Sequence, residues 1–114
     1  MDKQRLSAVA LAAIASRENE VLVSVATAWE ITIEVGIGKW PEAAHLADHF
    51  ESEVAAESFG VIAIEISHAR FAGLMTAAHR DPFDRLCAAQ AIIEGLTLVS
   101  SDPKVTGLGA PVLR

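Results

Sequence analysis

Apolar residues form two kinds of pattern along the chain. Short unbroken runs rich in β-branched residues are typical of strands that are buried on both faces of a sheet. Such runs occur as VLVSV at residues 21–25, VIAIEI at 61–66 and LTLVS at 96–100, and APVLR at 110–114 is expected to supply a short last strand.

Between these runs, apolar residues recur at helical spacing, which predicts amphipathic helices. Ser7, Ser67 and Asp81 are suited to cap the N-termini of helices, and Gly95 is suited to end one. The predicted helices cover residues 6–17, 26–35, 41–60, 67–78 and 82–94. Strands that alternate with helices indicate an α/β fold with a parallel sheet and right-handed crossovers.

The composition fits a single domain over residues 1–114. Of the 114 residues, 52% are hydrophobic, which is enough for a core. No apolar run reaches the roughly 18 residues of a membrane span, and no clear signal peptide is present, so we expect a cytoplasmic protein without membrane contact. Cys87 is the single cysteine, so no internal disulfide is possible.

The net charge of −6 argues against a broad basic surface that grips nucleic acid. Such a surface needs many Lys and Arg side chains to replace the counterions of the phosphates. Any contact with RNA is therefore expected to be local or mediated by a metal ion.

Several carboxylates fall where the strands of a parallel sheet should end. Glu30 lies in the first turns of the helix after residues 21–25, and Asp102 follows the strand at 96–100. Asp81 and Asp84 begin a helix that runs antiparallel to that strand, which places them at the same edge. Converging carboxylates repel, at a cost on the order of 4 kcal/mol for two charges about 4 Å apart at an effective dielectric near 20, so a cation is expected among them. Oxygen ligands alone favour Mg²⁺ or Mn²⁺, which activate water and stabilise a phosphodiester transition state.

Each of these residues also has a structural interpretation that the sequence leaves open. Asp81 before Pro82 is typical of a helix cap, and Asp84 is favoured in a first turn by the helix dipole. Asp102 before Pro103 is suited to cap a short helix. Glu30 has no comparable structural role.

The four histidines do not predict a better site. His45 and His49 have the i, i+4 spacing of zinc ligands but lack the acidic residue of an HExxH motif, so we expect them on the surface. His68 and His79 are isolated. His79 could touch phosphate together with Arg80, although a histidine in a loop is more often simply exposed.

Four blocks taken together are more specific than any one motif. They are SVATAWEITIEVGIGKW, HRDPFDRLCAAQAIIEG, LTLVSSD and GAPVLR, in this order and spacing. The combination closely resembles PIN-domain toxins of the VapC type over nearly the whole chain. The resemblance implies a metal-dependent endoribonuclease with a three-layer α/β/α fold, held inactive by a cognate antitoxin protein and commonly homodimeric.

The resemblance also implies roles for individual residues. Glu30, Asp84 and Asp102 would hold Mg²⁺ or Mn²⁺ and orient the attacking water, which requires the three acids to meet at one edge of the sheet. Ser100 falls where the family often has a Thr or Ser lining the site, so it joins the predicted catalytic residues. Asp81 then reverts to its capping role.

The chain departs from the family at its beginning. Relatives usually open with a strand that ends in the first metal-binding aspartate, and the expected fold lacks this central strand because the sequence starts at MDKQRLS. Unpaired backbone groups inside a fold cost roughly 1 to 3 kcal/mol each. We therefore expect the strands at 21–25 and 96–100 to pair directly, or a dimer to repair the gap.

Two functions of different classes follow from these patterns. The first is an RNA-cleaving enzyme. The second is a degenerate PIN-like protein that keeps only antitoxin binding or self-association, which the missing aspartate favours. A nucleotide-binding module is disfavoured because the sequence has no glycine-rich loop.

Overall fold

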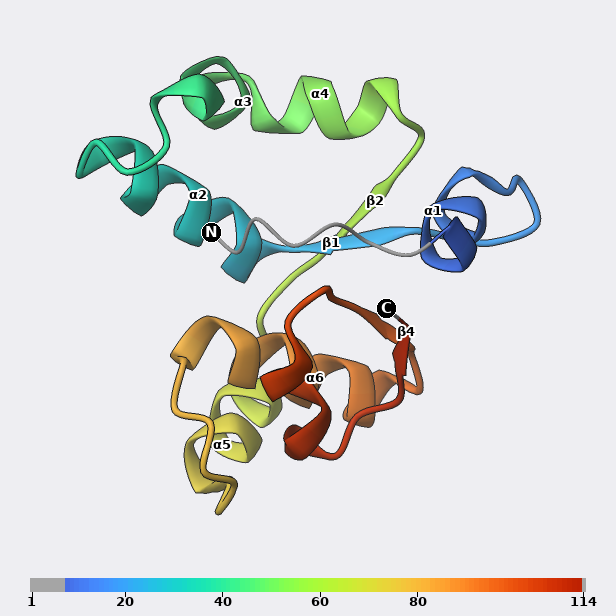
Figure 1. Cartoon of the computed structure of the whole chain (residues 1–114), viewed down its shortest axis with the longest axis vertical. Helices are drawn as coiled ribbons and strands as arrows, with labels where there is room; N and C mark the ends of the chain where they lie inside the picture. Colours follow the sequence, from blue (N-terminus) through green and yellow to red (C-terminus); the bar gives the residue numbers. More distant parts are fainter. Residues whose placement is uncertain (1–7, 114) are drawn as a thin grey trace. The chain divides into compact units, whose positions relative to one another are not determined.

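A computed structural model describes residues 8–113 (Figure 1). The described chain divides into two compact units, one made of residues 20–63 and the other of residues 8–19 together with 64–113. Each unit contains one pair of short parallel strands and its own helices.

The unit of residues 20–63 is built on two parallel strands. Strand β1 (Leu22–Ser24) pairs with β2 (Gly60–Ile62), with Leu22 opposite Gly60. A Cβ atom at Gly60 would lie 2.9 Å from Cδ2 of Leu22, so a larger residue at the start of β2 would require the Leu22 side chain to move. Helix α2 (Val25–Gly36) follows β1 without a loop, because the hydroxyl of Ser24 accepts a hydrogen bond from the N–H of Ala26 and caps the helix.

The chain between α2 and β2 packs a small core against α2. It forms the 3₁₀ turn η1 (Pro41–Ala43) and two short helices, α3 (Ala44–Asp48) and α4 (Phe50–Ala56). The buried residues of this core are Ile31, Ala43, Phe50 and Val54. The single helix expected over residues 41–60 is therefore wrong.

The interruption lies at His49, which separates α3 from α4. Its φ of −125° is not helical, and its N–H donates to the carbonyl of His45 to close α3. Ala43, Phe50 and Val54 nevertheless pack in the same core, as their spacing of seven and four residues along one helix face would also allow. His45 and His49 are exposed as expected, with ring centroids 4.4 Å apart.

The second unit contains the remaining elements. They are α1 (Ala8–Ala15), α5 (Ile66–Leu74), α6 (Pro82–Glu94), β3 (Leu98–Val99), η2 (Pro103–Leu108) and β4 (Val112–Leu113). Strands β3 and β4 are parallel, with Leu98 opposite Val112. The core between α6, η2 and the end of the chain is formed by Ala88, Ala91, Val105, Leu108 and Ala110.

Helix α6 begins and ends at the residues that the sequence predicts. Oδ1 of Asp81 accepts hydrogen bonds from the N–H groups of Phe83 and Asp84, and Pro82 occupies the first turn. Gly95 ends the helix in the left-handed region at φ 70°, which glycine adopts without a Cβ clash.

Helix α5 is attached to α6 by a buried histidine. His68 is only 1% exposed, its Nδ1 accepts from the N–H of Glu65 at 2.9 Å, and its Nε2 lies 3.0 Å from Oε1 of Glu94. The expectation that His68 is isolated is thus wrong. The helix also begins one residue earlier than predicted, at Ile66, with Glu65 in place of Ser67 as the N-cap.

The predicted α/β class with short parallel sheets is confirmed. Among residues 8–113, β1 pairs with β2 in one unit and β3 with β4 in the other. Direct pairing between residues 21–25 and 96–100, which lie in different units, stays a prediction. The strands at 61–66 and 96–100 are also shorter than expected. The predicted cap Ser7 lies outside the described residues. No helix in the described part of the chain is long and apolar enough to cross a membrane.

Candidate metal centre

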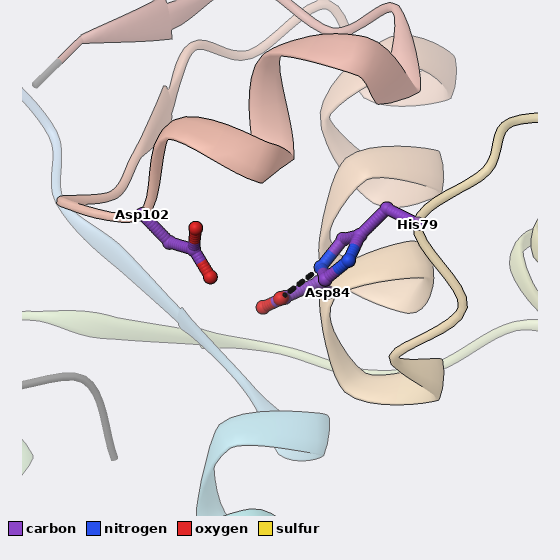
Figure 2. Close-up of side chains that lie close together, drawn as sticks. All are labelled: His79, Asp84 and Asp102. Atoms are coloured by element: carbon purple, nitrogen blue, oxygen red, sulfur yellow. Dashed lines mark hydrogen bonds and ion pairs between the residues drawn. The ribbon is translucent and has the colours of Figure 1, made fainter.

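Three side chains of the second unit come together at one point: His79, Asp84 and Asp102 (Figure 2). Each offers one possible ligand atom, and these atoms lie within 4.8 Å of one another. His79 comes from the segment between α5 and α6, Asp84 from the first turn of α6, and Asp102 from the start of η2. All three are half-buried.

Asp102 is held by two hydrogen bonds, one to its side chain and one from its backbone. Its Oδ1 accepts a hydrogen bond from the N–H of Lys104 at 2.9 Å and caps η2, as the sequence allows. Its N–H donates to Oγ of Ser100 at 3.1 Å. Within residues 8–113 the carboxylate of Asp102 forms no further hydrogen bond, so the cap orients it and Oδ2 remains available to a ligand.

Asp84 is paired with His79. Nε2 of His79 lies 2.7 Å from Oδ2 of Asp84, and the two side chains are 16% and 29% exposed. The pKa of Asp84 is raised above its ordinary value, mainly because burial disfavours the charged carboxylate, and the negative charges of Asp81 and Asp102 raise it further. The hydrogen bond and the charge of His79 act in the opposite direction without cancelling this effect.

Arg85 holds the segment that carries His79. Its Nε donates to the carbonyl of His79 at 2.9 Å, Nη1 to that of Ala72 at 3.2 Å, and Nη2 to that of Ala77 at 3.0 Å. The planar guanidinium group can donate to three carbonyl groups in different directions at once. Because Arg85 follows Asp84 in α6, one turn of helix both contributes a site carboxylate and positions the histidine beside it.

This donor set fits a divalent cation. Two carboxylates at the observed separation repel by roughly 3 kcal/mol at an effective dielectric near 20, and a cation removes that cost. Their oxygens are the ligands preferred by Mg²⁺ and Mn²⁺. Nε2 of His79 could serve as a nitrogen ligand only by giving up its hydrogen bond to Asp84, so in the observed arrangement it orients that carboxylate.

The structure brings together part of the predicted site. Asp84 and Asp102 meet as expected, Ser100 contacts the backbone of Asp102, and Asp81 is the helix cap. Glu30 is half-buried on α2, in the unit of residues 20–63, and its participation stays a prediction.

Sequence reasoning missed His79. A histidine two residues before an Asp-Pro cap can fold back over the first turn of the helix, and the spacing from His79 to Asp84 was the available signal. Its environment differs from the exposed loop that we expected.

Comparison with known families agrees with this geometry. The PIN domain family matches residues 1–109, so the chain belongs to the PIN domain family. Members of this family are typically metal-dependent nucleases. No curated protein and no solved structure gives a significant match.

Proposed function

We propose that this protein is a metal-dependent endoribonuclease, the VapC-type toxin of a type II toxin–antitoxin pair. The observation that carries the proposal is the convergence of Asp84, Asp102 and His79 in a chain of a nuclease family. The resemblance of the HRDPFDRL and AWEI blocks supports the toxin assignment.

The proposed roles follow from the contacts of each residue. Asp84 and Asp102 hold Mg²⁺ or Mn²⁺, His79 orients the Asp84 carboxylate, and Ser100 fixes the backbone of Asp102. When bound, the ion supplies Lewis acidity that activates water and stabilises the charge developing on the phosphodiester. The half-buried setting limits access of bulk water and strengthens the electrostatic interactions within the site.

Glu30 provides a test of the proposed ligand set. We expect Glu30→Gln to lower the rate of RNA cleavage in Mn²⁺ by about 10-fold or more, because an anionic ligand is lost while shape is kept. The assay uses small structured RNAs, with EDTA as the metal-free control and Glu51→Gln, at an exposed position on α4, as the matched variant. Equal rates for Glu30→Gln and the unmodified protein would remove Glu30 from the site. No cleavage by the unmodified protein under any divalent ion would end the nuclease proposal.

An exposed apolar stripe favours binding to another protein chain as well. On one side of α2, Val25, Trp29 and Ile33 are 41%, 58% and 36% exposed, and Ile37 just beyond the helix is 65% exposed. Large exposed apolar patches mark protein interaction sites. The stripe supports a homodimer or antitoxin contact, and it also supports the second candidate, a PIN-like protein that keeps only such binding.

Trp29 tests the self-association. We expect light scattering to give twice the monomer mass of 12.1 kDa, and Trp29→Glu to give the monomer, because a charge in an apolar interface is strongly unfavourable. Leu11→Glu, at a 54% exposed position on α1, is the control and should leave the mass unchanged. A monomeric unmodified protein would contradict the dimer.

A further inference from the structure

A groove of about 830 Å³ lies entirely within the unit that contains residues 64–113, and two of its lining residues are chain neighbours of the metal centre. Small residues of α5 line one wall, and the segment leading into α6 together with the first turns of α6 lines the other. Two cations belong to the second wall. Arg80 directly follows His79, and Arg85 directly follows Asp84.

Neither arginine is neutralised by a carboxylate in the described part of the chain. Arg85 donates only to uncharged carbonyl groups. Arg80 is exposed and forms no hydrogen bond or ion pair with residues 8–113. In a chain with net charge −6, the groove therefore has local positive charge that its own acids do not balance.

We propose that this groove is the subsite for the RNA strand next to the bond that is cleaved, and that Arg80 contacts a phosphate there. The proposal rests on the proposed nuclease function. The volume of the groove is in the range of sites for small organic ligands and is large enough for a nucleotide. Met75, Pro82 and Leu86 provide apolar surface against which a base can lie.

The position of the groove favours RNA over an acidic peptide as its occupant. The guanidinium group of Arg85 contacts the carbonyl of His79, and Arg80 is the next residue, so the cations of the groove adjoin the segment that carries His79. Elsewhere the negative charge of the protein opposes RNA, so one local arginine should contribute a large share of the electrostatic binding.

Gly73 offers a way to block the groove without changing its charge. It lies in α5 and lines the groove, and a Cβ atom built at this position meets no atom within 4 Å. Gly73→Leu should therefore occupy the groove while improving the helix propensity of α5. A loss of RNA binding in this variant would come from filled space.

The experiment measures binding of a fluorescent single-stranded RNA of about 12 nucleotides by anisotropy in EDTA, which prevents cleavage. We expect Arg80→Ala to weaken binding about fivefold or more and to reduce the slope of log K against log salt by about 0.7, the value for one phosphate contact. Gly73→Leu should weaken binding by a similar factor, with an unchanged circular dichroism spectrum. Arg70→Ala, at an exposed position on α5 outside the groove, is the control for charge alone and should bind almost as the unmodified protein does.

The outcomes separate this subsite from the nuclease proposal. If Arg80→Ala and Gly73→Leu bind RNA as tightly as the unmodified protein while cleavage still requires Asp84 and Asp102, the subsite is wrong and the enzyme stands. If both variants lose RNA binding but no metal supports cleavage, the groove stands as an RNA-binding site and the enzyme is wrong. Displacement of the RNA by poly-glutamate at equal charge would overturn RNA as the occupant and favour an acidic segment of a partner protein.

Discussion

Asp84→Asn is expected to lower metal-dependent RNA cleavage by at least about 100-fold and, at the same time, to raise the stability of the metal-free protein. The first effect follows because losing about 3 kcal/mol of charge stabilisation in the transition state corresponds to roughly two orders of magnitude in rate. Asp102→Asn should lose activity to a similar extent. Asp48→Asn, at an exposed position in α3, is the control and should cleave normally.

The gain in stability follows from the raised pKa of Asp84, whose main cause is burial. The folded protein binds this proton more tightly than the unfolded chain does. Binding of this proton therefore contributes to the free energy of unfolding. The contribution is fully present below the ordinary pKa of an aspartate and is lost as the pH rises through the raised pKa of Asp84. An amide cannot ionise, so Asp84→Asn should be more stable than the unmodified protein near neutral pH, and this difference should shrink in acid.

Urea unfolding with and without Mn²⁺ measures the change in stability of Asp84→Asn and its loss of metal binding. Metal at 100 times its dissociation constant should stabilise the unmodified protein by about 2.7 kcal/mol and Asp84→Asn far less. Unchanged cleavage in both Asp84→Asn and Asp102→Asn would eliminate the metal site. A loss of activity accompanied by a loss of stability in EDTA would instead assign Asp84 a structural role.

Arg85→Met should lower the free energy of unfolding by about 3 kcal/mol, since three hydrogen bonds from a charged donor are lost and three carbonyl groups lose their partner. Methionine keeps the apolar stem of the side chain, so the packing changes little. Thermal or urea unfolding in EDTA measures the effect without any contribution from metal.

Two further variants sharpen the result for Arg85. Arg85→Lys should recover only part of the loss, because an ammonium group cannot span the same three acceptors. Arg70→Met, on the exposed side of α5, should change stability by less than about 0.5 kcal/mol. A similarly small change in Arg85→Met would show that water replaces the three hydrogen bonds.

Local sequence signals predict the parts of the fold where side chain and backbone interact over a few residues. Asp81 with Pro82 and the glycine at Gly95 fix the two ends of α6. The rule that parallel strands gather functional groups at their carboxyl ends correctly brings Asp84 and Asp102 together, because both lie within one turn of such an edge.

The remaining features depend on contacts that no local pattern specifies. The break at His49 has no signal in residues 41–60, whose apolar spacing is compatible with a continuous helix. His68 is buried because Glu94, far along the chain, supplies its partner. Likewise, His79 joins the site because Arg85 anchors the carbonyl groups around it.

The adjacency of Asp84 and Arg85 places two different evolutionary constraints on neighbouring codons. A lineage that abandoned catalysis would be free to replace the carboxylate, and would even gain some stability by doing so. It would still have to retain the guanidinium group, because the path of the backbone between α5 and α6 depends on it. Among relatives, an altered aspartate beside an intact arginine would therefore mark proteins that keep the shape of a nuclease after losing its chemistry.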